Sequence, residues 1–178
     1  MEKIKCPLMD KDVSGFSCGN ASIDRQVEKS YFATLLKQAY GYQIKIKDQI
    51  VGYYMLYFRN INMKIVNDIM EEEYDSGMLD YYIAVHIRYL AIRKDLQHHG
   101  IGTNILKGII RQVLLLSESY SIRMITLDAL LEYYEWYKSI GFRDIPGAES
   151  DGITKPMFMD CVSIEDAGKL QDYVEGCF

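Results

Sequence analysis

The residue types and spacing best suited to chemistry lie between residues 90 and 103, in the stretch LAIRKDLQHHGIGT. An apolar run ends at Ile92, a short charged break follows, and Gly100 and Gly102 precede a helical pattern. A glycine-rich turn that opens a helix leaves backbone N–H groups unpaired, and these groups, with the helix dipole, bind phosphate. The stretch therefore predicts a phosphate or pyrophosphate site, although two glycines alone fit a plain helix start equally well.

Two familiar phosphate loops do not fit this stretch. A dinucleotide-binding turn requires a third glycine, and the sequence has Ile105 in that position. A Walker-type loop requires a lysine between its last glycine and a Ser or Thr, whereas Thr103 directly follows Gly102. The pattern that remains is Q-x-x-G-x-G, from Gln97 to Gly102.

This pattern, preceded by Leu90-Ala91-Ile92, closely resembles the pyrophosphate loop of the GNAT superfamily of acyl-CoA-dependent N-acyltransferases. Residues 125–129 (ITLDA), followed by 136–142 (WYKSIGF), resemble the second signature of that superfamily. Residues 16–24, with Phe-x-Cys-Gly-Asn and then Ile-Asp, resemble the N-terminal signature of its toxin-type subgroup. The resemblance implies an α/β (α+β) GNAT fold in one domain over residues 1–178, with helices flanking a mixed, mostly antiparallel central sheet whose central strands splay apart.

The resemblance also implies acetyl-CoA as co-substrate and no metal. Leu90 and Ile92 would offer backbone groups to the pantetheine arm, and the segment from Gln97 to Thr103 would surround the pyrophosphate. His98 and His99 stand where the family commonly has Gly-Lys or Gly-Arg, which removes a usual cation. The implied cofactor-binding residues are Leu90, Ala91, Ile92, Gln97, His98, His99, Gly100, Ile101, Gly102, Thr103 and Asp128.

Tyr137 is the candidate general acid. It stands four residues before Gly141, where the family has its catalytic tyrosine. A phenol beside the sulfur can protonate the departing CoA thiolate when the tetrahedral intermediate collapses. Helical spacing alone favours a wall or core residue, as it does for the neighbouring aromatics, so this role depends on the resemblance.

His86 is the candidate base that takes a proton from the attacking amine. It lies on a predicted central strand, and its ordinary pKa of about 6.5 suits that task. Strand alternation places His86 on the same side as Arg88, Leu90 and Ile92. A lone strand histidine is more often a packing residue, and Glu71-Glu72-Glu73 offers carboxylates instead, or simply forms a solvated acidic loop.

Periodicity predicts the elements that position these residues. Asn20 or Ser22 would cap a helix that runs to about Gln38 and is ended by Gly41. A second helix is predicted from Gly102, a short aromatic helix over residues 130–140, closed by Gly141, and a helical end to the chain. The predicted strands are 2–8, 42–47, 50–58, 82–92, 122–129 and 155–164, with a hairpin connection at Asp48-Gln49.

Composition limits the class of protein. The 178 residues are 49% hydrophobic and 25% charged, which are ordinary values for a globular domain. No apolar run reaches the about 18 residues of a membrane span, and no signal peptide is evident, so we expect a cytoplasmic protein without a membrane partner. The four cysteines and three histidines lack metal-ligand spacing, which predicts no metal site.

The sequence therefore predicts an acetyl-CoA-dependent N-acetyltransferase that transfers acetyl directly to a primary amine of a small molecule, peptide or protein. One alternative is a toxin-type GNAT that acetylates aminoacyl-tRNA, which the excess of 25 Asp and Glu over 20 Lys and Arg disfavours. Another is a non-catalytic acyl-CoA-binding module, against which Tyr137 and the intact loop argue. The resemblance also allows a homodimer.

Overall fold

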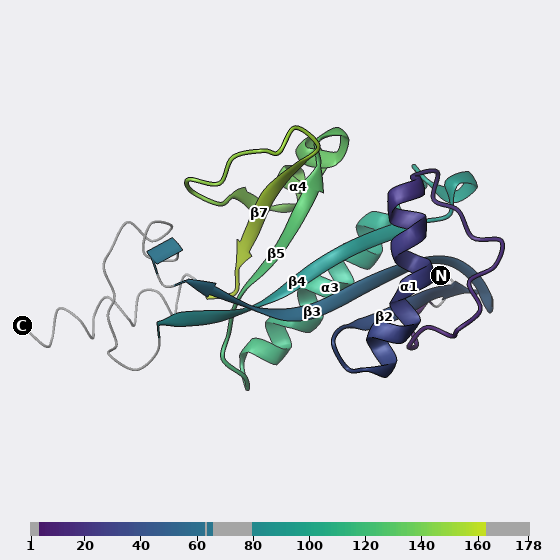
Figure 1. The fold of residues 1–178 in the computed structure, drawn as a ribbon, viewed down its shortest axis with the longest axis horizontal. Helices are drawn as coiled ribbons and strands as arrows, with labels where there is room; N and C mark the ends of the chain where they lie inside the picture. The colour runs from purple at the N-terminus through teal and green to yellow at the C-terminus, as the bar shows by residue number, and fades with distance from the viewer. Residues whose placement is uncertain (1–3, 63, 66–79, 163–178) are drawn as a thin grey trace, which may run out of the picture. The chain divides into compact units, whose positions relative to one another are not determined.

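The structure, a computed structural model, describes residues 4–62, 64–65 and 80–162 of the chain. Their strands form one seven-stranded sheet in the order β1-β2-β3-β4-β5-β7-β6. Figure 1 labels β2, β3, β4, β5 and β7. This mixed, mostly antiparallel sheet flanked by helices confirms the predicted α/β class. Its longest members are β3 (Gln49–Asn62) and β4 (Tyr81–Ile92), and the main helices are α1 (Ala21–Leu35) and α3 (Ile101–Ser117).

Contacts between residues divide the chain into two compact units. Among the described residues, the first comprises residues 4–59 and 85–112, and the second comprises residues 60–62, 64–65, 80–84 and 113–162. Strands β3 and β4 and helix α3 contribute residues to both units. The single domain and the splayed central strands remain predictions.

The first unit is built around a hairpin of β2 (Tyr40–Ile46) and β3. Ile46 pairs with Gln49, so the connection is Lys47-Asp48 and not the predicted Asp48-Gln49. Both connecting residues are left-handed, with φ of 50° and 61°, as a two-residue type I′ turn requires. Neither is a glycine, so composition gave no sign of this turn type. The short β1 (Ile4–Lys5) pairs with the far edge of β2, and covers less than the predicted strand 2–8.

Helix α1 begins where the sequence predicts and ends earlier. The Asn20 side chain accepts hydrogen bonds from the backbone N–H groups of Ser22 and Ile23, at 3.0 and 3.2 Å. The helix ends at Leu35, and the prediction that Gly41 ends it is wrong, because Gly41 lies within β2. A glycine is needed at position 41 for space, since a Cβ there would overlap the Met9 sulfur.

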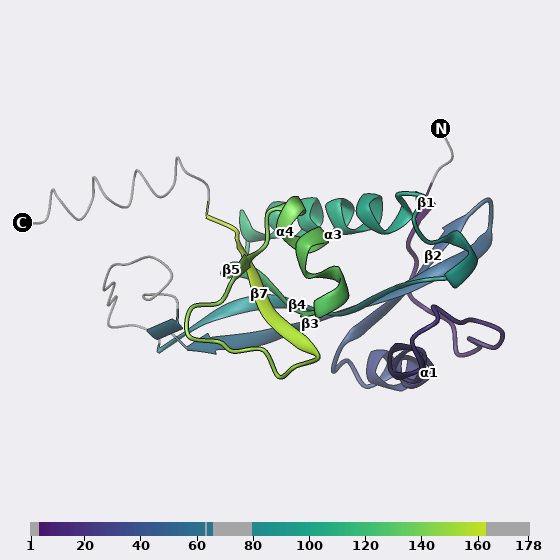
Figure 2. The same cartoon turned by 90° about the horizontal axis from the view of Figure 1, so that it is seen from above.

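One face of α1 packs on the sheet and buries an apolar core of the first unit. Tyr89 of β4 donates a buried hydrogen bond of 2.7 Å to Ser30 of α1, which satisfies both hydroxyl groups. In Figures 1 and 2, α1 lies on one side of strands β2 to β4, and the first part of α3 lies on the other. The core residues are Met9, Val27, Ala39, Tyr53, Met55, Tyr89 and Ala91.

The second unit contains β5 (Ile122–Leu130) paired antiparallel with β7 (Thr154–Asp160), and β7 paired with the short β6 (Arg143–Asp144). The predicted strands 122–129 and 155–164 correspond to β5 and β7, whereas β6 was not predicted. The predicted aromatic helix is a 3₁₀ turn (Leu131–Tyr133) followed by α4 (Tyr134–Ile140). Gly141 closes it with φ of 113°, as predicted.

Two sequence-based hypotheses concern residues that the structure does not describe. The acidic cluster at Glu71-Glu72-Glu73 and the helical end of the chain lie outside the described residues. The second predicted helix is α3, which begins at Ile101, one residue before the predicted start.

Candidate functional site

The glycine-rich loop of the first unit joins β4 to α3. A single 3₁₀ turn (Lys94–Leu96) follows the strand, and α3 then begins at Ile101. His98 and Gly100 both have left-handed backbone, with φ of 62° and 78°. Nothing lies within 4 Å of a Cβ added at Gly100, so this glycine is required by its conformation and not by lack of space. The chain thus turns sharply into the N-terminus of a 17-residue helix, the geometry that suits a phosphate group.

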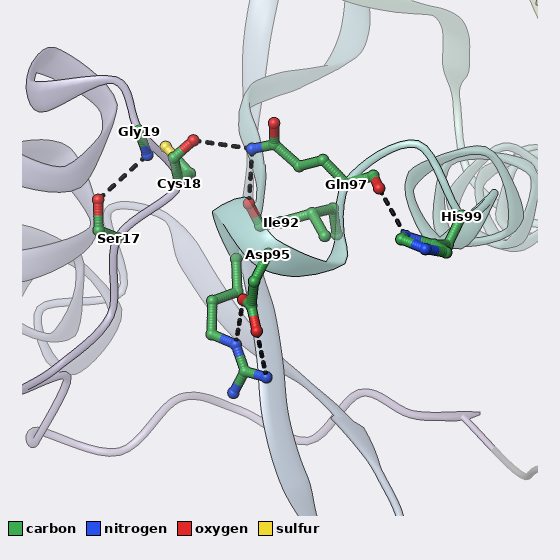
Figure 3. A network of polar contacts seen from close by, with 8 residues as sticks. Ser17, Cys18, Gly19, Ile92, Asp95, Gln97 and His99 are labelled. Carbon is green, nitrogen blue, oxygen red and sulfur yellow. Dashed lines mark hydrogen bonds and ion pairs between the residues drawn. The ribbon is translucent and has the colours of Figure 1, made fainter.

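The side chain of Gln97 links this loop to two other segments (Figure 3). Its Nε2 donates to the carbonyl oxygen of Cys18 at 2.7 Å and to that of Ile92 at 2.9 Å. An amide nitrogen carries two hydrogens, so both are used. The first residue of Q-x-x-G-x-G therefore connects the N-terminal Phe-x-Cys-Gly loop with the end of β4.

A second hydrogen bond strengthens the same connection. The backbone N–H of Lys94 donates to the carbonyl oxygen of Ser17 at 3.0 Å. The aliphatic part of the Lys94 side chain lies over Gly19, 3.1 Å from where a Cβ would stand. The two segments that resemble GNAT signatures, residues 16–24 and 97–102, are thus in direct contact.

His99 folds back onto the loop that carries it. Its Nδ1 lies 2.6 Å from the carbonyl oxygen of Gln97, and since a carbonyl only accepts, Nδ1 carries a proton and donates (Figure 3). The His99 ring adds a hydrogen bond that holds the turn, and the spacing of the motif gave no sign of it.

Asp24 organises the N-terminal loop. Its carboxylate accepts hydrogen bonds from the Cys18 N–H and the Ser17 hydroxyl, both at 2.8 Å. Burial alone would raise the pKa of Asp24, but the hydrogen bonds from Cys18 and Ser17 outweigh it and lower that pKa below its usual value. Burial and the nearby Asp24 raise the pKa of the Cys18 thiol to about 11. Cys18 therefore stays a protonated, unreactive thiol at neutral pH.

The predicted pantetheine-binding residues lie at the end of β4. Ala91 and Ile92 are buried, and Leu90 is half-buried. Strand β3 approaches closely here, because Arg93 N–H donates to the Val51 carbonyl at 2.8 Å and a Cβ on Gly52 would overlap the carbonyl oxygen of Ala91. Gly52 is thus a position where the sheet depends on the absence of a side chain.

His86 is buried, with 1% of its surface exposed, and its Nδ1 lies 3.3 Å from Nη1 of Arg59. The ring of Tyr57 lies against it, with centroids 4.9 Å apart. An arginine can only donate, so Nδ1 of His86 accepts, and the neutral ring carries its proton on Nε2. The lone pair that a base would use is therefore already directed at a cation.

Side chains near His86 do not alternate strictly between the two faces of β4. Arg88 was expected on the side of His86, yet its Nε donates to the side chain of Gln26 on α1 at 2.9 Å. The next residue, Tyr89, also reaches α1. Consecutive side chains therefore contact the same helix, and parity alone does not assign faces here.

Tyr137 lies on α4 in the second unit. Its ring packs beside Trp136 and edge-on to Phe142, with centroids 4.6 and 5.8 Å away. Burial, and to a lesser degree Tyr133, raise the pKa of Tyr137 well above the ordinary value for tyrosine. The phenol therefore keeps its proton at neutral pH, as a general acid must. Asp128 is exposed on β5, opposite Pro156 of β7.

The structure brings together the loop residues 90–103 and the Phe-x-Cys-Gly loop within the first unit, and it places Tyr137 and Asp128 in the second. The sequence analysis included Asp24 in the N-terminal signature without assigning its carboxylate a role, and it missed Tyr57 and Arg59. The position of Arg59 directly after the predicted apolar strand 50–58 was the one signal in the sequence that could have identified it. Across the described ranges no three His, Cys, Asp or Glu side chains gather as a metal site, and no helix there has the length and apolar character to cross a membrane.

Comparisons with known proteins show the fold. No protein-family model and no curated protein matches the sequence. A bacterial toxin matches with a TM-score of 0.74 at 16% identity, over 96% of this chain and 97% of its own. The structure of AtaT complexed with acetyl-methionyl-tRNAfMet gives 0.72 at 20% identity, over 92% and 98%. A mutant AtaT toxin bound to the C-terminus of the antitoxin AtaR and acetyl-CoA gives 0.66 at 17% identity, over 89% and 94%. The chain thus has the GNAT fold that its motifs predict.

Proposed function

We propose that this protein is an N-acetyltransferase that uses acetyl-CoA and transfers the acetyl group directly to a primary amine. The observation that carries the proposal is the loop from Gln97 to Thr103, which turns through two left-handed residues into the N-terminus of α3. It has the Q-x-x-G-x-G sequence, and Gln97 holds it to the end of β4. The likeness of the fold to a toxin bound to acetyl-CoA supports the same co-substrate.

In this proposal the loop binds the pyrophosphate of acetyl-CoA through backbone N–H groups and the dipole of α3. The backbone of Leu90 and Ile92 extends sheet-like hydrogen bonding to the pantetheine amides, and Thr103 adds its hydroxyl. Ala91, His98, Ile101 and Asp128 complete the proposed surroundings of the co-substrate.

Tyr137 acts as general acid in the proposed reaction. The amine attacks the thioester carbonyl, and the C–S bond breaks as the tetrahedral intermediate collapses. The phenol of Tyr137 gives its proton to the departing sulfur, and the proton lost by the amine restores the phenol through water. The raised pKa of Tyr137 keeps that proton in place before transfer. His86 was the sequence-based candidate for the base, but its Nδ1 contact with Arg59 favours another role.

Two acceptor classes remain as hypotheses. A small-molecule, peptide or protein amine agrees with the net charge of −5, which opposes binding of a polyanion. An aminoacyl-tRNA acceptor is supported by the likeness to AtaT complexed with acetyl-methionyl-tRNAfMet and by the Phe-x-Cys-Gly loop, which directly contacts the cofactor loop.

The test is a thiol-release assay with acetyl-CoA against amines, peptides and charged tRNA, paired with calorimetry of acetyl-CoA binding. Acetyl-CoA binding with turnover on one class establishes the enzyme and its acceptor. Acetyl-CoA binding without turnover on any acceptor favours the non-catalytic module. Absence of acetyl-CoA binding overturns the proposal. Sedimentation of the same protein decides whether it forms a homodimer.

A further inference from the structure

A polar cluster in the first unit lies outside the predicted cofactor contacts. Tyr57 and Arg59 belong to β3 and His86 belongs to β4. Arg59 Nη1 lies 3.3 Å from His86 Nδ1, and the Tyr57 ring covers the imidazole. His86 is buried, whereas Arg59 and Tyr57 are half-buried, so the cluster joins a buried histidine to a cation that solvent or a ligand can reach.

The charge of Arg59 has no carboxylate partner among residues 4–62, 64–65 and 80–162. The ion pairs found there are Lys5–Asp48, Arg93–Asp95 and Arg123–Asp160. A guanidinium has five N–H donors and stays charged at every physiological pH. One of these donors faces His86, which leaves a planar array of donors for an oxyanion. A half-buried arginine in this state is suited to bidentate binding of a phosphate or carboxylate.

His86 gives this arginine a fixed direction. Because its Nδ1 accepts from Arg59, the imidazole is neutral and anchors one arm of the guanidinium. Burial of the imidazole and its contact with Tyr57 restrict the ring, which in turn restricts the guanidinium. His86 is on this account a positioning residue and not the base.

The cluster lies far along the strands from residues 97–103, the loop proposed to bind the pyrophosphate. Arg93 contacts Val51, and Arg59 contacts His86, so β3 and β4 run antiparallel past each other. His86 precedes Ile92 by six residues, a distance of about 20 Å along a strand. An anion at Arg59 is therefore separate from a pyrophosphate held at residues 97–103.

We propose that Arg59, oriented by His86, binds an oxyanion carried by the acetyl acceptor, so that the acceptor has an amine together with a phosphate or carboxylate group. The inference rests on the proposed acetyltransferase function for the identity of the ligand. The oxyanion site itself depends only on the contacts of Arg59 and is tested without turnover.

The experiment titrates the ¹⁵N-labelled protein with inorganic phosphate and, separately, with acetate, while NMR follows the Arg59 Nε–H and the His86 ring. Both anions are tested with acetyl-CoA present and absent. A saturable shift with phosphate indicates a phosphate-bearing acceptor, and one with acetate indicates a carboxylate-bearing acceptor. Arg59→Gln should weaken the binding about ten-fold or more. Shifts confined to residues 97–103, or binding that survives in Arg59→Gln, would overturn the proposal.

A matched pair of variants tests the positioning role. In His86→Asn a carbonyl oxygen takes the place of Nδ1 as acceptor, whereas His86→Leu has the same branching without an acceptor. Anion binding at Arg59 should fall in His86→Leu and be largely restored in His86→Asn. Equal anion binding in the two variants, whatever their melting temperatures, contradicts the role of His86.

Calorimetry with acetyl-CoA separates this proposal from the proposed function. If acetyl-CoA binds but no anion binds at Arg59, the proposed acceptor subsite is contradicted and the proposed acetyltransferase function is not. Anion binding at Arg59 without acetyl-CoA binding leaves the oxyanion site and removes the acetyl acceptor as its ligand, which contradicts the inference as stated.

Discussion

Around Gln97 the chain is held by hydrogen bonds to main-chain carbonyls, whereas around Tyr137 it is held by the packing of aromatic rings. The Gln97 amide uses both its hydrogens on carbonyl oxygens, and Asp24 accepts two further bonds nearby. Tyr137 has Trp136 and Phe142 as ring neighbours. Directional bonds fix the path of a loop whose backbone, in the proposed function, faces the pyrophosphate of acetyl-CoA. Ring packing partly buries the phenol, and burial raises the pKa of Tyr137.

The largest effect is expected from Tyr137→Phe, which tests the role of the Tyr137 hydroxyl. This change keeps the ring packing and removes only the proton donor, so we expect the turnover number to fall by about 10²-fold or more. Acetyl-CoA affinity, measured by calorimetry, should stay within about two-fold, because the lost group acts after binding. Tyr134→Phe is the control, since the Tyr134 hydroxyl is exposed and donates to the Asp144 carboxylate. Equal turnover in the two variants would remove Tyr137 from the reaction.

A second comparison concerns two glycines of the first unit. Gly52→Ala places a Cβ into the Ala91 carbonyl oxygen, so we expect a loss of about 2–3 kcal/mol of unfolding free energy. Gly100→Ala meets no neighbour but forces alanine into φ of 78°, and should cost about 1 kcal/mol. Denaturant unfolding measures both. We also expect Gly100→Ala to weaken acetyl-CoA binding more than its small stability loss suggests, and the reverse order of stabilities would contradict the geometry.

Gln97→Leu tests whether directional bonds hold the loop. It removes the donors to Cys18 and Ile92 at similar volume, and we expect a loss of about 1–3 kcal/mol in unfolding free energy together with weaker acetyl-CoA binding. Gln112→Leu, at an exposed position of α3, is the matched control and should change neither quantity appreciably. Thermal unfolding and calorimetry give the two readouts, and a Gln97→Leu variant that binds acetyl-CoA normally would refute this account of the loop.

The smallest expected effect is the pH dependence of Asp24. Its pKa is lower in the folded chain than the ordinary 3.8, so its contribution to stability is complete above about pH 4 and is lost as pH falls through the folded pKa. The stability difference between the wild type and Asp24→Asn should therefore shrink under acid conditions. Asp95→Asn, in an exposed ion pair with Arg93, should show a smaller difference that salt removes. A pH-independent difference for Asp24 would contradict its hydrogen-bonded state.

Much of the fold follows from sequence patterns that are local. Asn20 was one of two predicted caps, the start of α3 was predicted to within one residue, and the closure at Gly141 was predicted, because cap residues and glycines mark these positions in the sequence. The end of α1 was misplaced because Gly41 serves close packing against Met9, which is a tertiary requirement. The turn at Lys47-Asp48 was misplaced by one residue because both its residues adopt left-handed backbone without being glycine.

The candidate site was less predictable than the fold. Motif spacing identified residues 97–103 but not the contact of Gln97 with Cys18, since the partner is a carbonyl 79 positions away. His86 was selected as an isolated titratable group, and only the pairing of β3 with β4 shows Arg59 facing its Nδ1. Long-range pairing of this kind leaves no trace in the spacing of a single sequence.

The link between the two loops also bears on how such a chain can diverge. Gln97 contacts the carbonyl groups of Cys18 and Ile92, and every amino acid offers that group. A change of side chain at position 18 or 92 therefore leaves the acceptor of this link in place, whereas position 97 is restricted to residues with a suitably placed donor. The link depends on the side chain of residue 97 alone, so it can persist while most of the surrounding sequence changes.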